Sequence, residues 1–140
     1  MFDQILLAVD GSEHAMHAAK IAGELTRAVR AKELRIVAAY EPVPVYLGEP
    51  NLQNTISARL HDSQSALQEA EGAVGEVPAG IQTEAVEGPI AEVIINIATV
   101  HHSDLIVMGS RGRGRLAGAI LGSNSQKVVS EAPCPVLIVR

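Results

Sequence analysis

The chain has 140 residues, of which 47% are hydrophobic and 19% charged, and its formal net charge at pH 7 is −5. This length and composition predict one globular domain over residues 1–140 and exclude a disordered chain. The acidic balance and the scarcity of aromatic residues argue against a nucleic-acid-binding surface, because such surfaces are basic or stack bases on aromatic rings.

Nothing in the sequence predicts secretion or insertion into a membrane. Residues 1–9 lack the basic start of a signal peptide, and no apolar run approaches the roughly 18 residues of a membrane span. The single cysteine, Cys134, cannot form an internal disulfide, and its place between two prolines beside an apolar run predicts a small apolar filler. We therefore expect a cytoplasmic protein.

The first half of the chain alternates between strand and helix. Residues 5–9 (ILLAV) form a continuous apolar run, which is typical of a parallel strand covered on both faces. Ser12 is a good N-cap for the next segment, in which alanines recur at helical spacing up to Val29. Residues 34–40 predict a second strand. The three prolines of residues 41–50 predict a connector without regular structure.

The second half continues the same alternation. Apolar residues from Leu52 to Val74 predict a second helix, which Gly72, Gly75 and Pro78 are expected to end. Residues 81–86 alternate apolar and polar side chains, as a half-exposed edge strand does. The other predicted elements are a third helix with Pro89 at its first position, a buried strand at residues 105–108, a short helix at 125–131 and a final strand at 136–139.

This order of elements predicts an α/β fold: an open, doubly wound, mainly parallel sheet of five strands, Rossmann-like, with helices on both faces. We expect the strand order 3-2-1-4-5. Ligands in such sheets bind beyond the carboxyl ends of the strands, where the strand order reverses. Asp10, after the first strand, would then face the segment that begins at Gly109 across a crevice.

Residues 109–125 (GSRGRGRLAGAILGSNS) give the strongest functional signal. Five glycines and three arginines lie between a predicted buried strand and a predicted helix start. Glycine lets backbone amides approach a ligand closely, the arginine fork suits phosphate oxygens, and a helix start has unpaired N–H groups. We therefore expect this segment to bind an anion or a nucleotide and not to be an ordinary surface loop.

Two common phosphate motifs fit this segment poorly. The Walker motif fails because Arg115 and Leu116 stand where it requires lysine and a hydroxyl residue. The dinucleotide motif occurs at residues 112–117, but later glycines interrupt the helix that it should open. The spacing that fits is G-x-x-G, nine residues and then G-S, formed by Gly109, Gly112, Gly122 and Ser123.

On these blocks the chain resembles the universal stress proteins of the single-domain, nucleotide-binding type. The matching blocks are VDGSE at residues 9–13, DLIVMGSRG at 104–112, LGSNS at 121–125 and APCPVLIVR at 132–140. The resemblance covers the whole chain. It implies a stress-response protein that binds ATP, accompanied by Mg²⁺ or Mn²⁺, as a regulatory module. AMP, ADP and cyclic AMP are alternative ligands, although the three arginines favour a polyphosphate.

The resemblance also implies roles for individual residues. Asp10 and Val9 would lie near the adenosine, Ala39 against the adenine, and Met108 and Gly109 beside the ribose. The phosphates would lie against Arg111, Gly112, Arg113, Gly122, Ser123, Asn124 and Ser125. Asn124 departs from the apolar residue that is common at its place in the family. The final strand would pair with its copy in a second subunit, giving a homodimer or a higher oligomer through Val136, Leu137, Ile138 and Val139.

No set of residues points clearly to catalysis. The histidines, which are His14, His17, His61, His101 and His102, have no cysteine or third ligand at a matching spacing, so we expect them on the surface or at helix ends. Ser110, Ser123 and Ser125 lack an evident base. Slow ATP hydrolysis or self-phosphorylation follows from the resemblance alone. The alternatives at this point are a weak ATPase or NAD-type oxidoreductase and a nucleotide-free dimeric interaction protein.

Overall fold

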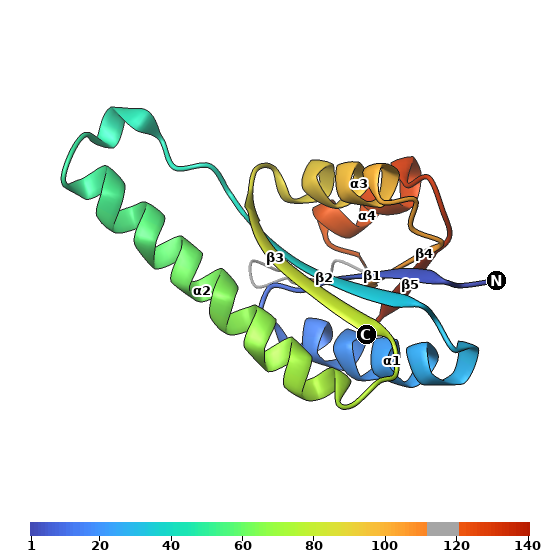
Figure 1. The fold of residues 1–140 in the computed structure, drawn as a ribbon. Helices are drawn as coiled ribbons and strands as arrows, with labels where there is room; N and C mark the ends of the chain where they lie inside the picture. The colour runs from blue at the N-terminus through green and yellow to red at the C-terminus, as the bar shows by residue number, and fades with distance from the viewer. Residues whose placement is uncertain (112–120) are drawn as a thin grey trace.

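The computed structural model describes residues 1–111 and 121–140 of the chain (Figure 1). In these residues the elements follow one another as β1 (Gln4–Ala8), α1 (Glu13–Val29), β2 (Glu33–Tyr40), η1 (Val45–Leu47), α2 (Asn51–Val74), β3 (Gly80–Glu87), α3 (Ile90–Val100), β4 (Leu105–Gly109), α4 (Ser123–Glu131) and β5 (Val136–Val139).

The strands form one sheet in the order β3-β2-β1-β4-β5, with every neighbouring pair parallel. This confirms the predicted fold class and strand order. β1 is the central strand, and Ile5 is paired with Leu34 of β2 on one side and with Leu105 of β4 on the other. β3 and β5 are the two edges.

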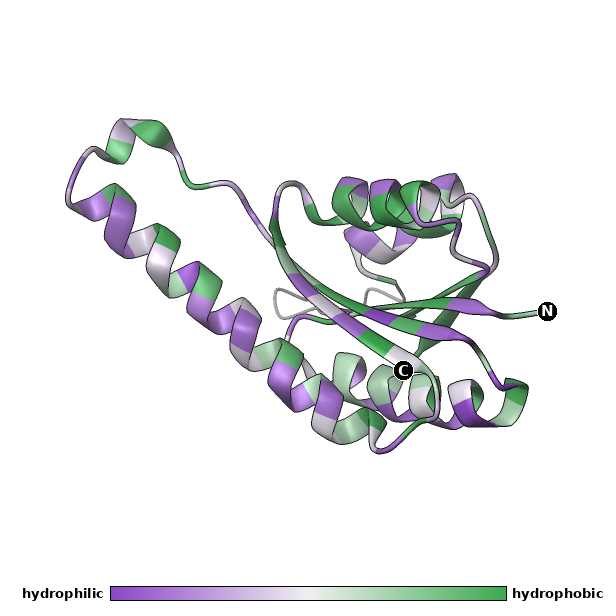
Figure 2. Ribbon diagram, viewed as in Figure 1, coloured by the Kyte–Doolittle hydropathy of each residue, from purple (hydrophilic) through white to green (hydrophobic). Residues whose placement is uncertain are grey.

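Helices cover both faces of the sheet, α1 and α2 on one and α3 and α4 on the other (Figure 1). Alternate residues of the central strand serve the two layers: Ile5 and Leu7 pack with α1 and α2, whereas Leu6 packs with α3. This explains why the central strands are apolar without alternation. Hydrophobic residues also dominate α3, while α2 mixes hydrophilic and hydrophobic residues along its length (Figure 2).

Small residues let α1 pack closely against its neighbours. Its buried face is formed by Ala15, Ala18, Ala19, Ala22, Gly23 and Thr26. A Cβ atom on Gly23 would lie 2.3 Å from the carbonyl oxygen of Val74, so only glycine fits where the end of α2 crosses α1. Arg27 then satisfies this helix end, because its Nη1 donates to the Val74 carbonyl at 2.9 Å.

Four details of the elements differ from the sequence prediction. One turn of 3-10 helix, η1, forms inside the proline-rich connector, between Pro44 and Gly48. Gly72 lies within α2, where an exposed glycine is tolerated, and Gly75 alone provides the C-cap. Pro89 is the N-cap of α3 and not its first residue. α4 begins at Ser123, two residues early, because Gly122 serves as its N-cap.

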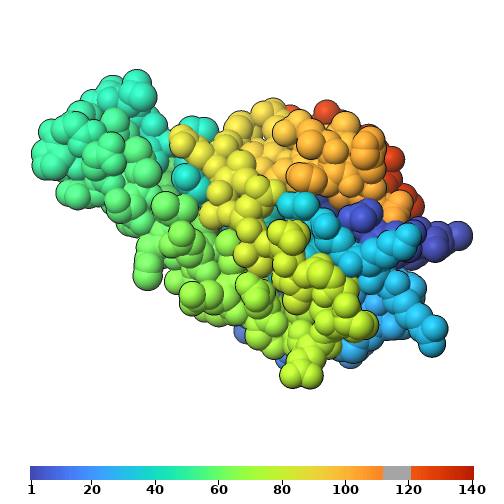
Figure 3. Space-filling view, viewed as in Figure 1, coloured from blue at the N-terminus to red at the C-terminus, as the bar shows by residue number. Residues whose placement is uncertain are grey.

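The connector and the start of α2 project from the body of the molecule (Figure 3). At the tip, Val45 and Tyr46 are 82% and 85% exposed. No helix in the described part of the chain is long and apolar enough to cross a membrane.

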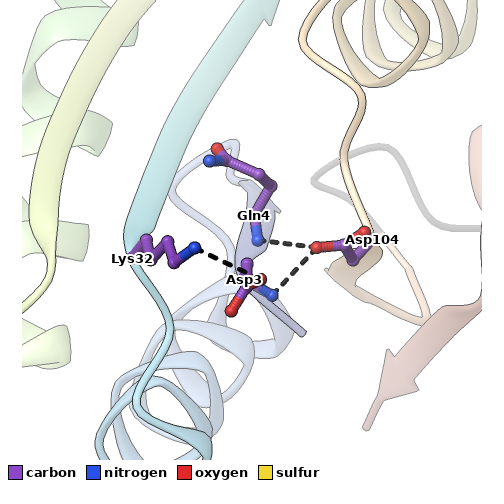
Figure 4. Close-up of polar contacts among 4 residues, drawn as sticks. All are labelled: Asp3, Gln4, Lys32 and Asp104. Carbon is purple, nitrogen blue, oxygen red and sulfur yellow. Dashed lines mark hydrogen bonds and ion pairs between the residues drawn. The ribbon is translucent and has the colours of Figure 1, made fainter. Parts of the chain in front are cut away.

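Asp104 ties the start of β1 to the start of β4 (Figure 4). Its Oδ2 accepts hydrogen bonds from the N–H groups of Asp3 at 2.8 Å and of Gln4 at 2.9 Å. Its own N–H donates to the carbonyl of Gln4 at 2.7 Å. The nearby ion pair between Lys32 and Asp3, at 3.8 Å, is largely exposed and adds little stability.

Cys134 lies partly buried against the second core layer, which fits the predicted role as an apolar filler. Burial raises the pKa of its thiol, and the carboxylate of Asp104 raises that pKa further. The thiol therefore stays protonated at neutral pH.

We expect Asp104→Ala to lower the free energy of unfolding by about 1–3 kcal/mol, because two strand-end N–H groups lose a charged acceptor. Urea denaturation measures this change. The control is Glu69→Ala, which removes a carboxylate from an exposed position on α2 and should leave stability nearly unchanged. Equal effects of the two substitutions would contradict an anchoring role for Asp104.

Candidate functional site

A cavity of about 660 Å³ opens where β1, β2 and β4 end. This volume is typical of sites for small molecules and cofactors. The chain leaves β1 into α1 on one face of the sheet and reaches β4 from α3 on the other face. The cavity therefore lies at the point where the strand order reverses, as the fold class predicts.

The cavity has an apolar part and a polar part. The apolar part is formed by strand ends and by α3, through Ala8, Val37, Ala38, Ala39, Ile90, Ile94 and Met108. The polar part is formed by the turn after β1, the end of β4 and the start of α4, through Asp10, Ser12, Gly109, Arg111, Gly122, Ser123, Asn124, Ser125 and Gln126. A ligand with a flat apolar end and a charged end would match this division.

The backbone of Ala39 presents a donor and an acceptor at the cavity. The carbonyl of Val37 accepts from the N–H of Val9 at 2.9 Å, so Val37 turns its polar backbone groups toward β1. These groups alternate sides along a strand, so Ala39 points its N–H and C=O the same way. β1 has already ended at Ala8, and these groups of Ala39 have no backbone partner among the described residues. They remain available to a ligand.

The start of α4 forms the polar end of the cavity. Gly122 is the N-cap, and the carbonyl of Gly122 accepts the helical bond from Gln126 at 3.0 Å. The N–H groups of the first turn, at Ser123 and the two residues after it, have no partner within the helix. Beside them, Nε of Arg111 is buried without a hydrogen-bond partner among the described residues. Unpaired donors and the positive end of the helix dipole together favour an anion.

Two hydrogen bonds hold the end of β4 against α4. The N–H of Gly122 donates to the carbonyl of Ser110 at 2.8 Å, and the hydroxyl of Ser125 donates to the carbonyl of Gly109 at 2.9 Å. Ser110 and Ser125 are buried, so both bonds are shielded from water. The start of α4 is thereby fixed relative to the sheet.

His14 has a role that sequence reasoning missed. A surface or helix-capping position was expected, but Nδ1 of His14 lies 2.6 Å from the hydroxyl oxygen of Ser110. Ser110 is only 1% exposed and does not line the cavity, so this pair joins α1 to the end of β4 and does not present a nucleophile there. His17, one turn further on, lies with Nδ1 3.0 Å from the carbonyl oxygen of Arg140.

The cavity also has a wall that the sequence motifs did not indicate. It comes from the middle of α2, through Arg59, Asp62, Ser63 and Ala66. These residues follow the spacing i, i+3, i+4 and i+7, so they share one helix face. Charged and small residues interrupt the apolar stripe of α2 there. This interruption was the available signal, because a purely packing face would continue with large apolar residues.

The described residues that the sequence predicted for nucleotide binding all line this cavity. They are Val9, Asp10, Ala39, Met108, Gly109, Arg111, Gly122, Ser123, Asn124 and Ser125. Gly112 and Arg113 lie outside the described residues. Within the described ranges, no group of three or more His, Cys, Asp or Glu side chains is placed to hold a metal ion.

The family model of the universal stress proteins matches the chain over residues 1–140. The chain belongs to the universal stress protein family. A universal stress protein of Thermus aquaticus is 48% identical over 140 residues, which cover 100% of both chains. The structure of the universal stress protein UspA from Lactobacillus plantarum superimposes with a TM-score of 0.88 at 26% identity, covering 99% of this chain and 98% of that one. A further universal stress protein, solved in complex with cAMP, has a TM-score of 0.74 at 26% identity and is covered over 95% of its length.

In this universal stress protein, α1 packs directly on the end of β4. A Cβ atom on Gly109 would lie 2.8 Å from the Cβ atom of His14 and 2.9 Å from its carbonyl carbon. We expect Gly109→Ala to lower the free energy of unfolding by about 1–3 kcal/mol, because backbone must move to make room. Gly80→Ala, whose Cβ atom would meet nothing closer than 3.9 Å, is the control in the same denaturation experiment. A loss no larger than that of the control would contradict the close packing.

Proposed function

We propose that this universal stress protein binds an adenine nucleotide, with ATP and Mg²⁺ or Mn²⁺ as its ligand, and acts as a regulatory binding module in the stress response. One observation carries the proposal. The same cavity is lined in its apolar part by Ala39, whose N–H and C=O lack a backbone partner among the described residues, and in its polar part by the start of α4 and Arg111. The related protein solved with cAMP supports an adenine nucleotide as the class of ligand.

The backbone of Ala39 suits the edge of adenine. Adenine carries an amino donor beside a ring-nitrogen acceptor, so it can donate to the Ala39 carbonyl and accept from the Ala39 N–H. Guanine has the opposite order on this edge, with a carbonyl acceptor beside an N–H donor. Met108 and Ile94 also line the cavity, and their apolar side chains would cover the faces of the ring. Base binding would therefore combine burial of a flat surface with two hydrogen bonds.

The phosphates would lie at the start of α4. The N–H groups of its first turn, the Asn124 amide and the Arg111 guanidinium can all donate to phosphate oxygens. Gly112 and Arg113, outside the described residues, extend the same basic sequence and are proposed to take part. A triphosphate makes fuller use of several cationic groups than the single charge of cyclic AMP does. The metal ion would be held mainly by the phosphates, and Asp10 would accept a hydrogen bond from the ribose.

Calorimetric titration with ATP and Mg²⁺ tests this proposal on wild type and on Gly122→Val. Gly122 has φ −68° and ψ 160°, which valine can adopt without backbone strain, and circular dichroism checks that the variant stays folded. The valine side chain would occupy space at the phosphates, and we expect ATP affinity to fall at least about tenfold. Gly72→Val is the control, since a Cβ atom at Gly72 meets nothing within 4 Å. Absence of ATP binding by wild type would favour a nucleotide-free interaction protein.

We also propose that the protein is a homodimer through β5. β5 is an edge strand of Val, Leu, Ile and Val, and its side chains at 136–138 are only partly buried. The row of backbone groups on its outer side has no partner within the described chain. Exposed apolar edge strands of this kind pair readily with another strand.

Ile138→Pro tests the dimer while sparing the pairing with β4. Val139 accepts from the N–H of Ser110 on the β4 side, so the N–H of Ile138 points outward by alternation. Proline removes that outward donor, and we expect the mass measured by analytical ultracentrifugation to fall from dimer to monomer. Circular dichroism checks that the variant stays folded. A monomeric wild type, or a dimeric folded variant, would contradict the β5 interface.

A further inference from the structure

Arg59 connects α2 to the end of β2 at the cavity. Arg59 lies in the middle of α2, and its side chain lines the cavity together with Tyr40 and Glu41. Its Nη1 donates to the carbonyl of Glu41 at 2.7 Å and to the carbonyl of Pro42 at 3.1 Å. These are the first two residues after β2, so Arg59 joins α2 to the backbone that follows Ala39 and Tyr40.

The backbone after β2 has few other restraints. The carbonyl of Tyr40 accepts from the N–H of Gly88 at 2.9 Å, which fixes the side that faces β3. Val43 is buried, but Val45 and Tyr46, only a few residues later, are more than 80% exposed on the projecting connector (Figures 1 and 3). Pro42 and Pro44 have no N–H to donate. On the α2 side, the described hydrogen bonds to this stretch come from Arg59.

We propose that Arg59 is a positioning residue for base recognition, and this inference rests on the proposed function. Ala39 is already paired with Val86 of β3 on one side of the strand. By holding Glu41 and Pro42 on the α2 side, Arg59 adds a second restraint on the end of β2 that carries the N–H and C=O of Ala39. Two hydrogen bonds to a flat base edge require both groups at once, and they weaken steeply as their geometry degrades. Loss of the Arg59 contacts would therefore lower the selectivity between bases more than the affinity for phosphates.

The test compares ATP with GTP, which carry the same triphosphate, so a change that is only electrostatic affects both ligands alike. We expect Arg59→Met to lower affinity for ATP about tenfold and affinity for GTP much less, so that the preference for ATP nearly disappears. Arg59→Lys keeps the charge and the donors but is one bond shorter, and its preference should fall between those of wild type and Arg59→Met. Gln64→Met, on an exposed position of α2 that does not line the cavity, should keep the wild-type preference.

The ratio of the two affinities is a property of the folded molecules alone, so partial unfolding of a variant does not change it. Equal weakening of ATP and GTP, or unchanged affinities in both Arg59 variants, would overturn the role of Arg59 alone. A wild type that binds ATP and GTP equally would also overturn it while leaving nucleotide binding intact. A wild type that binds neither nucleotide would overturn the proposed function and this inference together.

Discussion

The candidate site depends on a difference in length between neighbouring strands. β1 ends at Ala8, whereas β2 continues to Tyr40 beside it. Where the central strand stops, its neighbours lose their pairing partner. The N–H and C=O of Ala39, which lines the cavity, then have no backbone partner among the described residues. Had β1 continued beside Ala39, it would have paired these groups within the sheet. These are the groups that the proposed nucleotide would pair.

Close packing of small residues fixes the position of the end of β4, which forms part of the cavity. α1 places alanines against the sheet and meets Gly109 without room for a single extra methyl group. His14 joins the same helix to Ser110, and Ser125 joins α4 to Gly109. Because aromatic side chains are scarce, the core has few large groups that could separate these elements. The distance between α1 and the end of β4 is consequently set by close contacts between their backbones, which leave little free space.

The cavity combines an apolar part and a polar part. Apolar strand ends lie at one end, and unpaired helix N–H groups with Arg111 lie at the other, although the chain as a whole is acidic. A local positive end within an acidic protein favours a small anionic ligand over a nucleic acid, whose long charged backbone would meet the acidic surface. Arg59 differs from Arg111, because both described hydrogen bonds of its Nη1 go to backbone carbonyls of the chain itself.

The sequence determined the fold class, the strand order, most element bounds and the residues of the glycine-rich segment that meet at the cavity. It could do so because continuous apolar runs, helical alanine spacing and glycine motifs are local patterns that the backbone follows directly. It was wrong about Gly72 and about the histidine at position 14, and its one signal for Arg59 was the interruption of the apolar stripe of α2. Only the tertiary structure decided these points. The contact of His14 with Ser110, and that of Arg59 with the carbonyls after β2, depend on how a helix packs against a strand that is distant in the sequence. Local sequence patterns do not contain that information.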